Sequence, residues 1–198
     1  MLRHQAVYLD SPMAIAVTEI YHRYQNVYNS EDAAAMHHNA SGSLHTFLPV
    51  LRYSTSTEES MALNKVEAGT IIIAGSGMCT GGRIRHHFKH NLWRRNAHVI
   101  IVGYQAIGTP GRALVDGAKY FRIGGDKIAV NAAIHTLGGF SAHASQSQLL
   151  DWVKHFNEPH PRLFLIHGEA EAKTALQERL ATEGWKADIP HNGESITF

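Results

Sequence analysis

The chain has 198 residues, a formal net charge of +1 at pH 7 and 44% hydrophobic residues. This length fits one large domain or two small ones, and this hydrophobic share is enough for a core. The low net charge excludes a general positive field, so a polyanion would have to be held by local groups. A single cysteine, Cys79, excludes an internal disulfide and a cysteine-based zinc cluster and fits a reducing compartment. No apolar run approaches the roughly 18 residues that span a bilayer, so we expect a cytoplasmic protein without a membrane partner.

The first part of the chain predicts alternating strands and helices. Residues 6–9 form a short strand, and Pro12 suits the first turn of a helix capped by Ser11 or Asp10. The apolar spacing predicts one buried face on this helix, made of Ile15, Ile20, Tyr24, Val27 and Tyr28. Leu44, Phe47, Leu48 and Leu51 suggest a short helix in a less regular stretch.

A parallel α/β sheet is the expected fold class. The β-branched run 70–74 predicts a buried strand, followed by a glycine-rich loop, 75–82, and a helix, 83–93. A third strand, 98–102, runs into a second glycine-rich stretch, 103–111. This strand–loop–helix rhythm is typical of parallel sheets.

The pattern changes from about residue 120, which predicts two domains, 1–125 and 126–198. Gly124 and Gly125 indicate a hairpin turn between strands at 121–123 and 127–130. The remaining predicted elements are a helix at 147–156, a strand at 162–166, a helix at 170–182 that stops at Gly184, and strands at 186–189 and 195–198.

The two glycine-rich loops are candidate anion sites. A loop between a strand and a helix offers free backbone N–H groups and the helix dipole to a phosphate. Its candidate contacts are Ser76, Gly77, Thr80, Gly81, Gly82 and Arg83. Thr109 and Arg112 form a weaker candidate. The loops lack the signatures of nucleotide and dinucleotide sites, and a turn that needs glycine only for its backbone angles is an almost equal alternative.

Two histidines among small residues form the third candidate. His143 could donate a proton to a leaving oxygen, while nearby backbone amides and serines hold a phosphate. These neighbours are Ser141, Ala142, Ala144 and Ser145. His167 follows an apolar run, where a strand end suits a metal ligand. The alternative is that His143 caps the next helix and His167 only fills a strand end. His135 is expected to be structural.

Six motifs in order resemble the β-CASP metallo-β-lactamase family of RNA-processing nucleases, over essentially the whole chain. They are residues 10–14, 75–83, 103–105, 108–112, 139–144 and 167–169. The resemblance implies a β-CASP domain at 1–125, incomplete at its N-terminus. Residues 126–198 would then be the closing metallo-β-lactamase segment with an RNA-specificity tail.

The resemblance also implies roles and partners. His143 matches the motif B histidine, a proton donor or transition-state stabiliser at the scissile phosphate. His167 matches motif C, a ligand of one of two zinc ions. The stretch 141–145 is similar to a phosphate-holding loop, although many members carry aspartate where this chain has Ser145. RNA is the implied substrate, and a homodimer is a further expected arrangement that the sequence leaves open.

In this family the zinc pair depends on a His-x-His-x-Asp-His motif, another histidine, an aspartate and a further acidic motif, all upstream, and no His-x-His-x-Asp-His occurs in this sequence. One histidine does not fix a zinc ion. We therefore expect a fragment of a zinc-dependent ribonuclease that is inactive alone, exposes apolar surface and lacks its N-terminal metallo-β-lactamase half, through a truncated gene model, a split gene or excision of a domain. The alternatives are a non-catalytic RNA-binding or accessory module and, less favoured by the ordered motifs, a small-molecule-binding domain.

Overall fold

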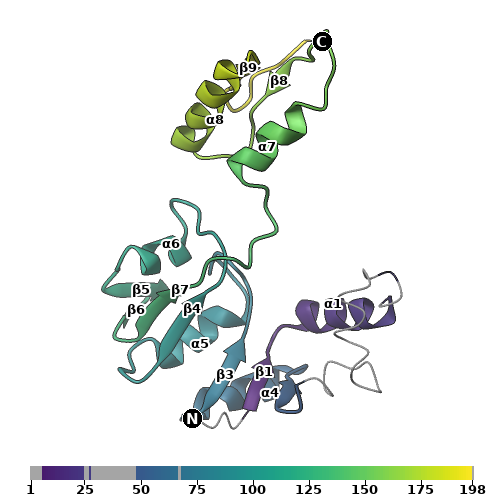
Figure 1. Cartoon of the computed structure of the whole chain (residues 1–198). Helices are drawn as coiled ribbons and strands as arrows, with labels where there is room; N and C mark the ends of the chain where they lie inside the picture. Colours follow the sequence, from purple (N-terminus) through teal and green to yellow (C-terminus); the bar gives the residue numbers. More distant parts are fainter. Residues whose placement is uncertain (1–5, 25–26, 28–47, 67, 198) are drawn as a thin grey trace. The chain divides into compact units, whose positions relative to one another are not determined.

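The computed structural model describes residues 6–24, 27, 48–66 and 68–197 and confirms a mixed α/β fold with parallel strands (Figure 1). The chain divides into two compact units, Met1–Phe140 and Ser141–Phe198. The sequence placed a domain boundary near residue 125, whereas the units divide between Phe140 and Ser141. None of the helices in the described ranges is long and apolar enough to cross a membrane.

The first sheet of unit 1 is parallel, with strand order β2-β1-β3. Its strands are β1 (Ala6–Leu9), β2 (Leu51–Tyr53) and β3 (Thr70–Ile73). Val7 on the central strand is the register partner of Leu51 on one side and Ile71 on the other. Helix α1 (Pro12–Arg23) follows β1, and Ser11 is its N-cap because its hydroxyl accepts a hydrogen bond from the Ala14 N–H at 3.4 Å. Of the two predicted caps, Ser11 is thus the one used.

The predicted buried face of α1 is wrong for most of its members. Ile15 is buried, but Ile20, Tyr24 and Val27 are 51%, 54% and 72% exposed, and Tyr28 lies outside the described residues. The strand predicted at 70–74 exists as β3, yet Ile73 is 50% exposed rather than buried. Both errors have one cause. The apolar spacing predicts that another layer of the fold covers these side chains, and the described residues do not form such a layer.

The helix predicted around residues 44–51 is corrected where the structure describes it. Leu51 begins strand β2 and is buried against Val7, since pairing with β1 satisfies its backbone better than an isolated helical turn. Leu44 and Phe47 lie outside the described residues. After β2 come two elements that the sequence did not predict, helix α4 (Thr57–Ala62) and the short 3-10 helix η2 (Leu63–Lys65).

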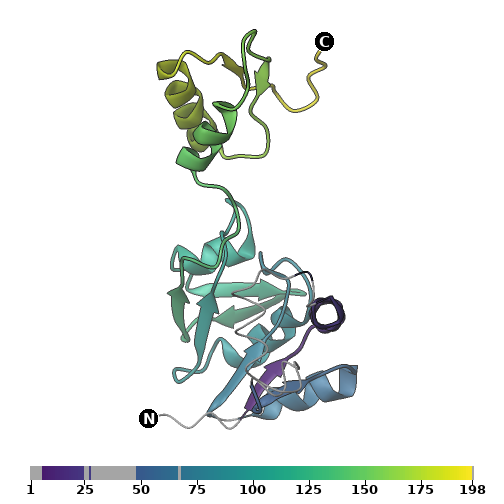
Figure 2. The same ribbon diagram turned by 45° about the vertical axis from the view of Figure 1, so that its right-hand side comes forward.

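The side chains of the second core of unit 1 come from the segments that follow β3, whose ribbons Figure 2 draws in teal and green. Strands β4 and β7 pair in parallel, and β5 and β6 form the predicted hairpin. Phe88 and Phe121 meet edge to face in this core, with ring centroids 5.3 Å apart. Helix α6 and strand β7 were not predicted. The elements are α5 (Arg83–Asn91), β4 (His98–Ile101), α6 (Pro110–Val115), β5 (Tyr120–Ile123), β6 (Asp126–Ala129) and β7 (Ala133–Thr136).

Unit 2 packs two helices against a two-stranded parallel sheet. Helix α8 ends where Gly184 adopts a positive φ of 84°, as predicted. The predicted strand 162–166 is shorter, and residues 195–197 form no strand. The core consists of Leu150, Val153, Leu180, Trp185 and Ala187. The elements are α7 (Gln146–Val153), β8 (Leu163–Phe164), α8 (Ala170–Thr182) and β9 (Ala187–Asp188).

Candidate functional site

The first glycine-rich loop, residues 75–82, uses many of its polar groups internally. The Ser76 hydroxyl accepts a hydrogen bond from the Gly81 N–H at 3.1 Å and lies 3.4 Å from the Thr80 hydroxyl. The Ile84 N–H, in the first turn of α5, donates to the Gly75 carbonyl at 3.0 Å. These groups are therefore occupied within the loop and by the first turn of α5, whereas the Gly77 N–H has no hydrogen-bond partner among the described residues.

Gly82 shows why this loop needs glycine. Its φ is +71°, and a Cβ atom at this position would lie 2.3 Å from the carbonyl oxygen of Gly75. The backbone of residue 82 must pass that close to residue 75 for α5 to begin there. Gly82 thus fits the alternative of a turn that needs glycine for its backbone angles. Gly77 does not, because a Cβ atom at that position would meet nothing within 4 Å.

Arg83 was predicted to contact phosphate, and the structure places its guanidinium on protein acceptors. One terminal nitrogen lies 2.6 Å from the Asp10 carboxylate and also donates to the Ser54 carbonyl at 2.9 Å. The other terminal nitrogen donates to the Thr55 carbonyl at 3.0 Å. This leaves only part of the guanidinium for a ligand, and Arg83 joins strand β1 to helix α5.

Asp10, which the sequence offered only as a helix cap and as the first residue of a motif, is the centre of this network. Its side chain is fully buried, and its second carboxylate oxygen lies 2.6 Å from His87 Nε2 and accepts from the Ser60 hydroxyl at 2.7 Å. Burial raises the pKa of the Asp10 carboxyl, but hydrogen bonds from groups including Ser60 and His87 outweigh it, so the net pKa lies below its ordinary value. A charged residue at the end of an apolar strand was the available signal.

Gln105 ties the second glycine-rich stretch to the first. Its side-chain amide nitrogen donates to the carbonyl of Gly77 at 2.9 Å, and the Gly111 N–H donates to the Met78 carbonyl at 3.1 Å. A Cβ at residue 111 would lie 1.8 Å from the Gln105 side-chain oxygen. The two candidate loops therefore form one connected substructure in unit 1.

Thr109 and Arg112, the weaker anion candidates, are both engaged locally. The Thr109 hydroxyl is the N-cap of α6, accepting from the Arg112 N–H at 3.3 Å and donating to the Ala106 carbonyl at 2.7 Å. The Arg112 side chain forms an exposed ion pair with Asp116 at 2.9 Å. Thr109 therefore acts as the N-terminal cap of α6.

The loop that carries His143 lies in unit 2, directly before α7. His143 is exposed, its backbone N–H donates to the Ser141 hydroxyl at 3.2 Å, and its imidazole forms no hydrogen bond or ion pair with the described residues. Ser145 is the N-cap of α7: its hydroxyl accepts from the Gln148 N–H at 3.4 Å, and its own N–H donates to the Gln148 side chain at 2.8 Å. The helix is thus capped by Ser145 rather than by His143.

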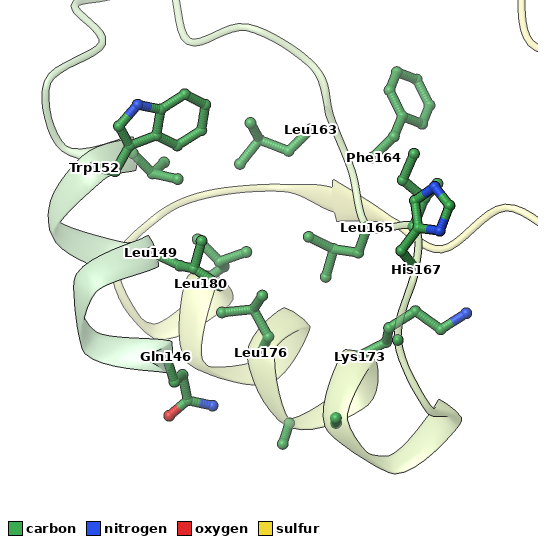
Figure 3. A pocket seen from close by; sticks show the side chains of 15 residues that line it. Gln146, Leu149, Trp152, Leu163, Phe164, Leu165, His167, Lys173, Leu176 and Leu180 are labelled. Carbon is green, nitrogen blue, oxygen red and sulfur yellow. The ribbon is translucent and has the colours of Figure 1, made fainter. Parts of the chain in front are cut away.

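His167 stands at the edge of an apolar cavity of about 530 Å³ between α7, α8 and β8 (Figure 3). Its backbone has a positive φ of 57°, and its side chain is exposed just after β8. Figure 3 shows leucines converging inside the cavity, with His167 and Lys173 at the end away from Trp152. The main apolar residues of the wall are Leu149, Trp152, Leu163, Leu165, Leu176 and Leu180.

No group of three or more histidine, cysteine, aspartate or glutamate side chains within the described part of the chain is placed to hold a metal ion. His143 and His167 belong to the same unit, but His143 does not line the cavity beside His167. A different histidine pair is in contact: His98 Nδ1 and His135 Nε2 lie 2.9 Å apart on the neighbouring strands β4 and β7. The sequence did not predict this pair because it did not predict β7.

Two family models match the chain. The Beta-Casp domain matches residues 2–114, and the Zn-dependent metallo-hydrolase RNA specificity domain matches residues 127–190. The first match covers the parallel sheet and both glycine-rich loops of unit 1. The second covers the His143 loop, the apolar cavity and His167.

Curated relatives agree with these models. Ribonuclease TTHA0252 of Thermus thermophilus is 39% identical over 96% of this chain and 42% of its own length. The transcription termination factor FttA of Methanocaldococcus jannaschii is 31% identical over 82% of this chain and 26% of its own. The probable RNase MJ4 of the same organism is 29% identical over 96% of this chain and 41% of its own. This chain spans less than half the length of each of these relatives, and it belongs to the β-CASP family, as its six ordered motifs predicted.

Proposed function

We propose that this chain is part of a zinc-dependent ribonuclease that hydrolyses RNA phosphodiester bonds. The family models and the relatives named as ribonucleases support an RNA-processing nuclease. The observation that carries the proposal is the His143 loop. Its imidazole is exposed, and it is not needed as the cap of helix α7 because Ser145 caps that helix.

In this proposal His143 acts on the leaving group. When the phosphorus–oxygen bond breaks, the departing ribose oxygen gains negative charge, and a protonated imidazole within hydrogen-bond reach neutralises it. The backbone amides of Ala142 and Ala144 are the groups that would orient the phosphate. The Ser145 hydroxyl is less suited to this task, because it is already hydrogen-bonded to Gln148 and lies 3.0 Å from the Ser147 hydroxyl.

The described residues do not form a zinc site by themselves. His167 is one exposed donor, the described residues hold no group of three ligands, and structural and catalytic zinc ions take at least three protein ligands. We therefore assign His167 as one zinc ligand and expect the others from a metallo-β-lactamase half.

The apolar cavity beside His167 supports such a partner. Trp152 and Ile166 are 60% and 63% exposed there, in a wall made mostly of apolar residues. A partner that buried this wall would gain apolar contact area and at the same time bring its own ligands next to His167. The buried, unpaired Cys79 fits a cytoplasmic location for the assembly, and a homodimer is a further proposed arrangement.

A non-catalytic RNA-binding or accessory module is the second candidate. The incomplete ligand set and a relative named as a transcription termination factor favour it. In that case the chain would bind RNA through its loops and surfaces without cleaving it.

Zinc content and cleavage of single-stranded RNA separate the two candidates. Both are measured for the chain alone and for the chain mixed with the part of Thermus thermophilus ribonuclease TTHA0252 that lies outside the aligned region. We expect neither zinc nor cleavage for the chain alone, and both for the mixture. Stoichiometric, tightly held zinc in the isolated chain would contradict the shared site, and an inactive, metal-free mixture would favour the accessory module.

A further inference from the structure

Helix α5 has two different faces. His87, Phe88 and Leu92 are buried in unit 1, where Phe88 and Leu92 belong to its core and His87 contacts Asp10. The opposite face follows the spacing i, i+3, i+4 and i+7 and points to solvent. It carries His86, Lys89, His90 and, in the turn after the helix, Trp93.

Positive charge on and after α5 is only partly neutralised. The sequence contains no aspartate or glutamate from residue 68 to residue 115. Lys89 has an acidic partner, Asp126, at 2.7 Å. Arg85 instead donates to the carbonyls of Thr80 and Arg122, and Arg94 to that of Val66. A neutral carbonyl positions a guanidinium without cancelling its charge, so these arginines remain sources of positive potential.

Trp93 is the exposed aromatic residue of this surface. Its side chain is 53% exposed, and the guanidinium carbon of Arg94 lies 5.5 Å from the centroid of its ring. The side chain of Asn131 donates to the Trp93 carbonyl at 3.0 Å, which holds the backbone of the turn. An exposed ring beside a guanidinium, on a turn whose backbone is fixed by a hydrogen bond, can stack on a nucleobase while the cation attracts its phosphate.

We propose that this α5 surface, defined as Arg85, His86, His90, Trp93, Arg94 and Arg95, binds single-stranded RNA. One base stacks on Trp93, and Arg94 and Arg95 bind the adjacent phosphates. Exposed aromatic rings interleaved with cations are how proteins hold unpaired strands without reading sequence, whereas a duplex hides its base faces. The helical step from Arg85 to Asn91 alone spans about 9 Å, and the turn that carries Trp93 extends the surface further, which is long enough for more than one phosphate.

This inference rests on the proposed RNA substrate, and it adds a contact outside the two glycine-rich loops and the His143 loop. The whole surface belongs to unit 1 and uses only described residues. It can therefore be tested in the chain as it exists, without zinc, without cleavage and without a metallo-β-lactamase partner.

The first experiment measures fluorescence anisotropy of a labelled single-stranded oligouridylate with the full chain in metal-free buffer. Trp93→Ala should weaken binding about 5- to 50-fold, as expected for the loss of one stacked base, while Trp93→Phe should keep most of the affinity. Tyr120→Ala is the matched control, because Tyr120 is 54% exposed with the Lys127 ammonium 3.8 Å from its ring. The control should change the affinity less than twofold.

The second experiment separates specific phosphate contacts from net charge. Reversing Arg94 and Arg95 to glutamate should reduce the slope of log K against log salt by about 1.4, which corresponds to two lost phosphate contacts on a single strand. Reversing the exposed Lys119 and Lys127 to glutamate changes the net charge equally in the same unit and should leave the slope almost unchanged.

Equal RNA affinity of wild type, Trp93→Ala and the Arg94/Arg95 reversal overturns the inference, and so does a wild-type chain that does not bind the oligonucleotide. If these variants keep RNA affinity but no longer associate with the metallo-β-lactamase half, the α5 surface is a protein interface and the inference is also wrong. The proposed function is judged separately by zinc content and cleavage in the mixture, so the two can fail independently.

Discussion

Arg83 and Asp10 are 73 positions apart in the sequence, and an ion pair of 2.6 Å joins them. Asp10 follows strand β1 and Arg83 begins helix α5, so the contact ties the first motif of the family to the second. Because Asp10 is fully buried, its charge depends on this partner and on His87. A family motif that first suggested phosphate binding thus has a structural task as well.

Replacing Asp10 with asparagine should lower the free energy of unfolding of unit 1 by about 3 kcal/mol, because it leaves Arg83 and His87 without their anionic partner. Urea denaturation followed by circular dichroism checks this. Asp126→Asn is the matched control, since its ion pair with Lys89 is exposed and should contribute less than about 1 kcal/mol. Similar losses for both variants would contradict the buried role of Asp10.

The same carboxyl predicts a pH dependence. The pKa of Asp10 is lowered in the folded chain relative to its ordinary value of 3.8, so the folded state favours the ionised form. The resulting stability is present above the ordinary pKa and is lost as pH falls through the lowered one. The difference in unfolding free energy between wild type and Asp10→Asn should therefore be constant near neutral pH and shrink below about pH 4. A difference that grows toward acid would have the wrong sign.

Gly82→Ala should destabilise unit 1 by about 2 kcal/mol or more. The new Cβ would lie 2.3 Å from the Gly75 carbonyl oxygen, and the residue would need a φ of +71°. Gly77→Ala, in the same loop, introduces a Cβ with nothing within 4 Å and should have a much smaller effect. The melting temperatures of the two variants, measured by thermal unfolding, test this difference. Equal melting temperatures would contradict the close approach between residue 82 and the Gly75 carbonyl oxygen.

Ser145→Ala should cost unit 2 about 1 kcal/mol, the usual effect of removing an N-cap hydroxyl. Ser141→Ala is the control, because Ser141 accepts only the His143 N–H in an exposed loop. In the active mixture, Ser145→Ala should reduce cleavage no more than its loss of stability explains. A large loss of cleavage with unchanged stability would instead make the Ser145 hydroxyl a phosphate contact.

His143→Ala and His167→Ala should differ in the mixture with the metallo-β-lactamase half. His143→Ala should lower the cleavage rate about 10²- to 10⁴-fold with zinc content unchanged, since a proton donor is lost. His167→Ala should lower both zinc content and cleavage, since a ligand is lost. Zinc analysis on the same samples separates the two roles, and loss of zinc from His143→Ala would contradict the proton-donor assignment.

The sequence predicted the elements whose signal is local. The β-branched runs of β3 and β4 and the cap of α1 are readable from a few neighbouring residues. Strand β7 was missed because its short sequence becomes a strand only by pairing with β4, which is distant in the chain. The same reason hid the main acceptor of Arg83, because a residue next to a glycine loop gives no sign of an aspartate 73 positions earlier.

The exposure of β3 and α1 has the same origin. Their apolar spacing was readable, but whether another layer covers them depends on parts of the fold that spacing does not encode. Likewise the residue types around His143 and His167 indicated chemistry, whereas the helix cap at Ser145 became clear only with the backbone of α7 in place.

The separate cores of the two units also decide how the chain loses its structure. Trp185 is buried in the core of unit 2, while the buried clusters of unit 1 contain no tryptophan. Because no buried cluster of the described residues is shared between the units, we expect two unfolding steps rather than one midpoint and one enthalpy. The fluorescence of a buried indole would follow unit 2, while helical signal would follow both units together.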